Sequence, residues 1–208
     1  MNQPYYIVIE GNIGSGKTTL ARALAHYLEA RLVLEEFEAN PFLEGFYREP
    51  HRYAFSVEMA FLADRYHQLS EQVQVEDLFA PTLIADYAPW KSLIFAQNNL
   101  DAKEFNLYRR FWEMSLGSLR KPDLVIYLQR SIPSLLAKIY YRGRRYEQCI
   151  GEEYLRSIHQ SYESFFRQHP ETKVYRVNAD EHDFLKKKTT ISKLWEKIIE
   201  VHSPSGPR

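Results

Sequence analysis

The sequence predicts an α/β protein in which a parallel sheet of five strands lies between layers of helices. Short apolar segments alternate with longer amphipathic ones, which is typical of a parallel sheet whose connections are helices. Residues 5–9 are continuously apolar, as expected of a strand buried on both faces. They lead into a glycine-rich turn, residues 11–18, that opens a helix. These three observations predict a three-layer fold of the P-loop NTPase type.

The other elements follow in order along the chain. Further strands are predicted from apolar segments at 31–36, 81–87, 122–128 and, more weakly, 173–177. Helices are predicted where apolar residues recur every three or four positions, at 20–28, 58–73, 103–119, 152–168 and 191–202.

The chain has 208 residues, enough for one domain with a substantial core. We expect a single domain over 1–202 and a disordered tail over 203–208. The 27 basic and 27 acidic residues give a formal net charge of zero, which favours neither a nucleic acid polymer nor an anionic membrane as partner. The single cysteine, Cys149, fits a reducing compartment, and no secretory signal precedes the first strand. We therefore expect a soluble cytoplasmic protein.

The glycine-rich turn has the chemistry of a phosphate site. It satisfies G-x-x-x-x-G-K-[ST] in the required place, between a buried strand and a helix. Its glycines let backbone N–H groups face phosphate oxygens, and the helix N-terminus adds positive potential. Lys17 is expected to reach the outer phosphates, and Thr18 to offer a hydroxyl to Mg²⁺. The predicted ATP-binding residues are Gly11, Asn12, Ile13, Gly14, Ser15, Gly16, Lys17, Thr18 and Thr19.

The residues after the second predicted strand indicate the phosphate acceptor. Glu35, Glu36 and Glu38 crowd there, and no arginine occurs between Arg31 and Arg48. A carboxylate suits a neutral hydroxyl acceptor, whose proton it can take, whereas a phosphate acceptor would call for arginines. A hydroxyl acceptor is therefore favoured over the phosphate acceptor of a thymidylate-type nucleoside monophosphate kinase.

A cluster of basic residues predicts a lid over the donor phosphates. The segment "YYRGRRYEQ" (140–148) clusters Arg142, Arg144 and Arg145, and we expect it to follow a helix and to form a lid of about residues 141–150. Guanidinium groups there would stabilise the transferring phosphoryl group. Glu147 follows closely and is positioned to accept hydrogen bonds from a sugar hydroxyl.

These motifs resemble the deoxynucleoside kinase family, especially its bacterial deoxyadenosine/deoxyguanosine kinase branch. The resemblance runs from "IEGNIGSGKTT" to "VNADEHDF" (177–184), and its most specific parts are "EANPFLEGFYREPHRYAF" (38–55) and "RGRRYEQ". It implies a P-loop domain with a five-stranded parallel sheet, a homodimer, and an ATP-dependent kinase that uses Mg²⁺. The implied reaction is transfer of the γ-phosphoryl group to the 5′-hydroxyl of a deoxyribonucleoside, with purines favoured.

The resemblance also implies roles for single residues. Glu35 matches the general base, Tyr47 and Glu147 match the pair that binds the 3′-hydroxyl, and Arg65 matches an arginine beside the nucleobase. Lys17, Arg142 and Arg144 would complete the catalytic set. Asp86 matches the acid that opens the family's D/E-R-S motif near Mg²⁺, so Thr18 and Asp86 are the predicted metal ligands. Residues 177–184 match the loop around the donor adenine.

Two departures from the family pattern fall on the acceptor side. The D/E-R-S motif is replaced by Asp86-Tyr87-Ala88, which lacks the arginine, and Glu58 stands where the family usually has a glutamine that reads the nucleobase. Lys91 lies four residues after Tyr87. We hypothesise that Lys91 supplies the missing positive charge near Glu35 and that Glu58 is its ion-pair partner. The missing arginine also leaves open a nucleotide-binding protein that has lost catalysis.

Overall fold

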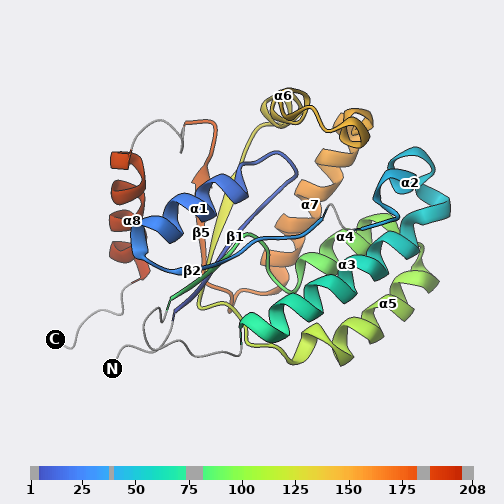
Figure 1. Cartoon of the computed structure of the whole chain (residues 1–208), viewed down its shortest axis with the longest axis horizontal. Helices are drawn as coiled ribbons and strands as arrows, with labels where there is room; N and C mark the ends of the chain where they lie inside the picture. Colours follow the sequence, from blue (N-terminus) through green and yellow to red (C-terminus); the bar gives the residue numbers. More distant parts are fainter. Residues whose placement is uncertain (1–4, 38–39, 74–81, 182–187, 203–208) are drawn as a thin grey trace.

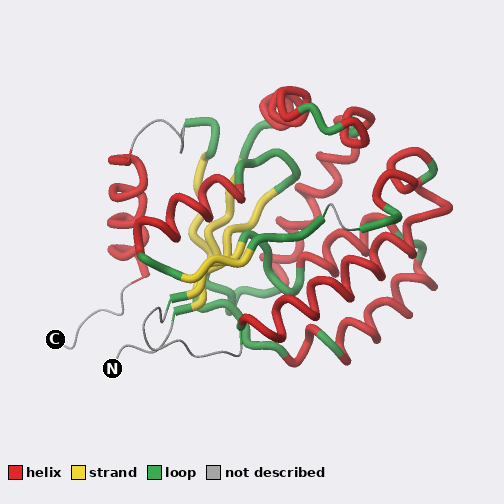
Figure 2. Tube along the Cα trace, viewed as in Figure 1, coloured by secondary structure: helices red, strands yellow, loops and turns green. Residues whose placement is uncertain are grey.

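The structure is a computed structural model, and it describes residues 5–37, 40–73, 82–181 and 188–202. It has three layers, with the sheet between helices on both faces (Figures 1 and 2). The predicted tail over 203–208, Glu38 and the last residues of the 177–184 segment lie outside the described residues. None of the described helices has the length and apolar content needed to span a bilayer.

The sheet has five parallel strands in the order β2-β3-β1-β4-β5. Its strands are β1 (Tyr6–Gly11), β2 (Arg31–Val33), β3 (Leu83–Ala85), β4 (Leu124–Gln129) and β5 (Val174–Asn178). The central strand β1 is paired on both sides, with Val8 opposite Ala85 in β3 and Val125 in β4. The fold class expected from the sequence is confirmed.

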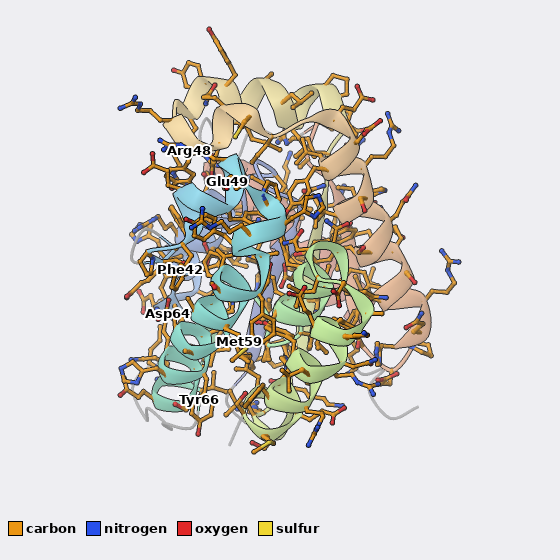
Figure 3. All side chains as sticks on the ribbon, turned by 90° about the vertical axis from the view of Figure 1, so that its right-hand side faces the viewer. Phe42, Arg48, Glu49, Met59, Asp64 and Tyr66 are labelled. Atoms are coloured by element: carbon orange, nitrogen blue, oxygen red, sulfur yellow. The ribbon has the colours of Figure 1, made fainter. Side chains whose placement is uncertain are left out.

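Helices connect the strands. They are α1 (Lys17–Leu28), α2 (Leu43–Arg48), α3 (Pro50–Gln72), α4 (Lys91–Asn99), α5 (Ala102–Met114), α6 (Ile132–Arg142), α7 (Glu152–Gln168) and α8 (Lys188–His202), with 3-10 turns η1 (Leu116–Ser118) and η2 (Arg145–Cys149). Figure 3 views the helical side, where α2 carries Arg48 and α3 carries Met59, Asp64 and Tyr66.

The alternation of side chains along β1 divides the core in two. Ile7 and Ile9 pack against the face covered by α1 and α8, while Tyr6 and Val8 pack against the face covered by α3, α4 and α7. All four side chains are buried. Because both faces need apolar residues, the strand reads as a continuous apolar run rather than an alternating one.

Several predicted boundaries were wrong. The second strand ends at Val33 rather than at residue 36, because only residues 31–33 pair with β3 and the chain then leaves the sheet. The helix predicted at 58–73 begins at Pro50, a residue favoured in a first helical turn. The helix predicted at 103–119 ends at Met114, where Ser115 leaves helical geometry and its hydroxyl donates to the carbonyl of Phe111.

Candidate active site

The glycine-rich turn lies at the carboxyl end of β1, beside the carboxyl end of β3. Gly16 is the N-cap of α1 and has φ 99°, a left-handed conformation that favours glycine. The first turn of α1 then begins with Lys17. Its Nζ donates to the backbone carbonyls of Gly11 and Asn12, at 2.9 Å each. This ammonium group therefore lies over the loop whose N–H groups are expected to bind phosphate.

The helix that leads into the lid packs directly on this turn. A Cβ atom at Gly14 would lie 3.0 Å from the carbonyl oxygen of Leu135 and 3.0 Å from Ile139, both on α6. The turn is also tied to α7, since the side-chain amide of Asn12 donates to the carbonyl of Leu155 at 2.7 Å. The phosphate loop is thus packed against α6 and hydrogen-bonded to α7.

Burial, together with the positive charge of Lys91, lowers the pKa of Lys17 to about 8. The carboxylates of Glu10, Glu35 and Asp86 act in the opposite direction. A triphosphate would add further negative charge at this point. Lys17 is therefore expected to be protonated when ATP is bound.

Asp86 connects the phosphate loop to the acceptor side. Its Oδ2 accepts a hydrogen bond from the hydroxyl of Thr18 at 2.5 Å, and its Oδ1 accepts from the backbone N–H of Glu35 at 2.8 Å. The early end of β2 makes this second contact possible, because it allows the backbone of Glu35 to approach β3. A hydroxyl and a carboxylate beside a phosphate site are ligands that suit Mg²⁺.

Glu35 is held by two cations. Its Oε1 accepts from Nε of Arg65 at 2.9 Å and from the terminal nitrogen of Arg65 at 2.6 Å, while its Oε2 accepts from Nζ of Lys91. All three side chains are largely buried. Burial alone would raise the pKa of Glu35, but Lys91 and Arg65 outweigh it and lower the pKa to about 2. Glu35 is therefore ionised throughout the neutral range.

The predicted contact between Lys91 and Glu35 is confirmed, but the predicted pairing of Lys91 with Glu58 was wrong. Oε1 of Glu58 accepts from the side-chain amide of Asn99 at 2.7 Å, and Oε2 makes no hydrogen bond to a described residue. Arg65 donates to Ser92 at 2.8 Å. Glu58 and Arg65 are seven residues apart on α3, and their partners Asn99 and Ser92 are seven residues apart on α4. The two helices therefore run antiparallel, with Glu58 level with Asn99 and about 10 Å along the helix from the level of Arg65 and Ser92.

A cavity of about 130 Å³ brings the predicted residues together. Thirteen of them line it: Ile13, Gly14, Lys17, Thr18, Glu35, Tyr47, Glu58, Arg65, Asp86, Lys91, Arg142, Arg144 and Glu147. Apolar side chains from α2, α3 and α4 also line it. A wider cleft of about 1410 Å³ shares the wall formed by Lys17, Thr18 and Glu35 and continues past the phosphate loop and lid. The small cavity is thus a candidate acceptor site that opens onto the donor site.

The lid residues form their own ion-pair cluster. Glu147 is buried and accepts from Arg142 and, at 3.3 Å, from Arg144. The guanidinium of Arg144 also lies 3.9 Å from the centre of the Phe37 ring, a cation–π contact between the lid and the segment after β2. Tyr47 stacks on Tyr146 of the lid, with ring centroids 5.9 Å apart. The lid is therefore in contact with the acceptor side of the site.

Some residues around the cavity were not anticipated from the sequence. Asn99, Ser92 and Tyr154 come from α4 and α7 and carry no motif. Glu10 lies beneath the site, where its carboxylate accepts from the backbone N–H of Ala88 and the hydroxyl of Tyr162, both at 2.7 Å. Of these residues, only Glu10 could have been noticed in the sequence. It is a glutamate inside a strand that is buried on both faces, and buried acids need specific partners.

Comparison with known proteins gives one consistent result. A sequence model of the deoxynucleoside kinase family matches residues 7–202. The deoxyguanosine kinase of Bacillus subtilis (strain 168) is 34% identical over 205 residues, covering 97% of this chain and 99% of that protein. The deoxyadenosine/deoxycytidine kinase of the same strain is 25% identical over 199 residues, covering 94% and 92%.

A solved structure has a similar fold. The structure of deoxyadenosine kinase from M. mycoides with bound dATP has a TM-score of 0.79 and 29% identity, and the match covers 93% of this chain and 98% of that one. Family match, sequence identity and fold similarity all extend over nearly the whole chain. The chain therefore belongs to the deoxynucleoside kinase family.

Proposed function

We propose that this protein transfers the γ-phosphoryl group of ATP to the 5′-hydroxyl of a purine deoxyribonucleoside, with Glu35 as the general base. One observation carries the proposal. The ionised carboxylate of Glu35 lines a cavity that opens onto the phosphate loop. Asp86 accepts hydrogen bonds from the backbone N–H of Glu35 and from the hydroxyl of Thr18 in that loop. An acceptor hydroxyl bound beside Glu35 is thus adjacent to the donor phosphates.

The transfer is a single displacement. The 5′-oxygen forms a bond to the γ-phosphorus, the bond from that phosphorus to the β,γ-bridging oxygen breaks, and ADP leaves. Glu35 takes the hydroxyl proton. With a pKa of about 2, it is a weak base. It therefore orients the hydroxyl first and accepts the proton late, as bond formation makes the hydroxyl acidic, which suits a loose transition state.

The positions of three cations support stabilisation of the transferring group. Lys17 lies over the phosphate loop, and Arg142 and Arg144 line the cavity from the lid. Thr18 and Asp86 would hold Mg²⁺, which neutralises phosphate charge when bound. The described residues contain no group of three or more His, Cys, Asp or Glu side chains suited to hold a metal. The phosphates of ATP are thus the expected source of the other ligands.

Lys91 supports retained catalysis rather than a binding protein that has lost it. The family's motif arginine is replaced by Tyr87, whose hydroxyl donates to Gln68. A positive charge is nevertheless present at Glu35, since Lys91 is hydrogen-bonded to it. Lys91 and Arg65 are both bonded to Glu35, so these cations do not favour a second phosphate as acceptor.

We also propose that the protein acts as a cytoplasmic homodimer. Helix α5 exposes Leu107, Phe111 and Met114 at helical spacing, an apolar stripe suited to contact with a second copy. Sedimentation velocity at micromolar concentration tests for the dimer, and a purely monomeric species would contradict it.

A panel of acceptors tests the function. Purified protein is incubated with γ-labelled ATP and Mg²⁺, and each deoxyribonucleoside, ribonucleoside and nucleoside monophosphate is offered in turn. Label is expected in deoxynucleoside 5′-monophosphates. Label in diphosphates made from monophosphates would indicate a monophosphate kinase, and ATP binding without transfer to any acceptor would indicate lost catalysis.

A further inference from the structure

The peptide group that joins Leu34 to Glu35 is held by a side chain at each of its two polar atoms. Strand β2 has ended at Val33, so pairing between strands no longer holds the backbone here. The N–H of Glu35 donates to Oδ1 of Asp86 at 2.8 Å. The carbonyl of Leu34 accepts from the side-chain amide of Gln68, also at 2.8 Å. Side chains thus bind both polar atoms of the peptide group from which the proposed base projects.

The orientation of Gln68 is fixed by Tyr87. The carbonyl of Leu34 can only accept, so the amide nitrogen of Gln68 must face it, and the amide oxygen points to a donor. That donor is the hydroxyl of Tyr87. Tyr87 is buried, and burial together with the nearby carboxylate of Glu35 raises the pKa of its hydroxyl above the ordinary value. The hydroxyl is therefore protonated at neutral pH and donates to Gln68.

Helix α3 and the segment after β3 both contact residue 35 through these bonds. Arg65 and Gln68 are three residues apart, on one face of α3. Arg65 binds the carboxylate of Glu35, and Gln68 binds the carbonyl that precedes it. Asp86 and Tyr87 are consecutive, and they reach the same peptide group, Asp86 directly and Tyr87 through Gln68. The backbone and the carboxylate of Glu35 are thus held by separate groups.

We propose that Tyr87 and Gln68 are positioning residues for catalysis, which fix the backbone from which Glu35 projects. This inference rests on the function proposed above, in which Glu35 is the base. A base must lie within hydrogen-bond reach of the reacting hydroxyl, and a misplacement of about 1 Å can lower the rate about 10²-fold. Neither Tyr87 nor Gln68 is among the described residues that line the acceptor cavity. Both would therefore act through Glu35 rather than on the nucleoside.

Tyr87→Phe separates this role from packing, because phenylalanine keeps the ring and removes only the hydroxyl. Single-turnover transfer at saturating substrates should fall about 5- to 50-fold, less than for a full misplacement, since Asp86 still holds the N–H of Glu35. The affinities for ATP and nucleoside should change by less than about twofold. The matched control is Tyr127→Phe, in the same apolar cluster, where the hydroxyl contacts His159 instead. This control should transfer phosphate at the wild-type rate.

Two double variants test whether the effect passes through Gln68 and Glu35. Gln68→Met removes the bond to Leu34, so Gln68→Met with Tyr87→Phe should lose no more activity than Gln68→Met alone. In Glu35→Gln no base remains to be positioned, so adding Tyr87→Phe should cause no further loss of transfer. Additive losses in either double variant would overturn the inference.

Hydrogen exchange of the Glu35 backbone amide gives a measurement that needs no transfer. By NMR without substrates, exchange should be faster in Tyr87→Phe and Gln68→Met than in the wild type, and unchanged in Tyr127→Phe. Wild-type exchange and wild-type transfer in Tyr87→Phe would each overturn the inference alone. No transfer by the wild type, or an unaltered rate in Glu35→Gln, would instead overturn the proposed function, and with it the catalytic role of both residues.

Discussion

Replacing Lys91 with methionine tests whether two cations hold Glu35 in its ionised form. Methionine keeps much of the side-chain length and removes the charge. The pKa of Glu35 is lowered from 4.5 to about 2, a difference that corresponds to about 3 kcal/mol of stability at neutral pH. Removing one partner of a buried pair costs about 3–5 kcal/mol, but here Arg65 remains bonded to Glu35. We therefore expect Lys91→Met to lower the free energy of unfolding by about 1–3 kcal/mol at pH 7.

The pH dependence separates this cause from ordinary loss of packing. A carboxylate whose folded pKa is lowered contributes stability above its unfolded pKa of about 4.5, and that contribution is lost as pH falls toward about 2. The difference between wild type and variant should thus shrink from about pH 7 to about pH 3.5. Urea unfolding followed by tryptophan fluorescence measures it, with Lys197→Met on the exposed face of α8 as the matched control. A difference of constant size at both pH values, or an equal loss in the control, would refute the reasoning.

Three further variants test the donor and sugar contacts. Lys17→Ala should lower kcat by about 10²-fold or more, because the ammonium neutralises phosphate charge. Circular dichroism should show an intact fold. Activity within a few-fold of wild type would exclude this loop as the donor site. Arg144→Ala should lower kcat more than it lowers the affinity for ATP, as expected of a lid arginine that acts on the transferring group. A loss of ATP affinity with unchanged kcat would instead assign Arg144 to ground-state binding. Tyr47→Phe should weaken deoxynucleoside binding about 2- to 10-fold, and the variant should no longer distinguish 3′-deoxy analogues; a retained distinction would remove Tyr47 from the sugar site.

The donor side was predictable because its chemistry is local. The phosphate loop is one continuous segment, and its glycines, Lys17 and Thr18 follow from the strand before it and the helix after it. The parallel sheet was predictable for a similar reason, since β1, β3 and β4 read as buried, mainly apolar runs. Strand ends were less accurate, because the length of β2 depends on its pairing with β3 rather than on residues 34–36 themselves.

The acceptor side depends on contacts between distant helices. Lys91 was placed correctly near Glu35, but its pairing with Glu58 was wrong, because the register of α3 against α4 sets which side chains meet. That register puts Arg65 level with Ser92 and Glu58 level with Asn99. No spacing within either helix contains this information. Asn99, which carries no motif, was missed for the same reason.

The most direct test of the central claim is the rate of phosphoryl transfer in Glu35→Gln. Glutamine keeps the shape of the side chain and removes the base, so single-turnover transfer to deoxyguanosine should fall by about 10²–10⁴-fold with little change in nucleoside affinity. Glu36→Gln removes the neighbouring charge and should lose far less. Urea unfolding of both variants confirms that each is folded at the assay temperature. If Glu36→Gln shows the large loss instead, Glu36 is the base; if folded Glu35→Gln transfers phosphate at the wild-type rate, a carboxylate-assisted hydroxyl acceptor is contradicted.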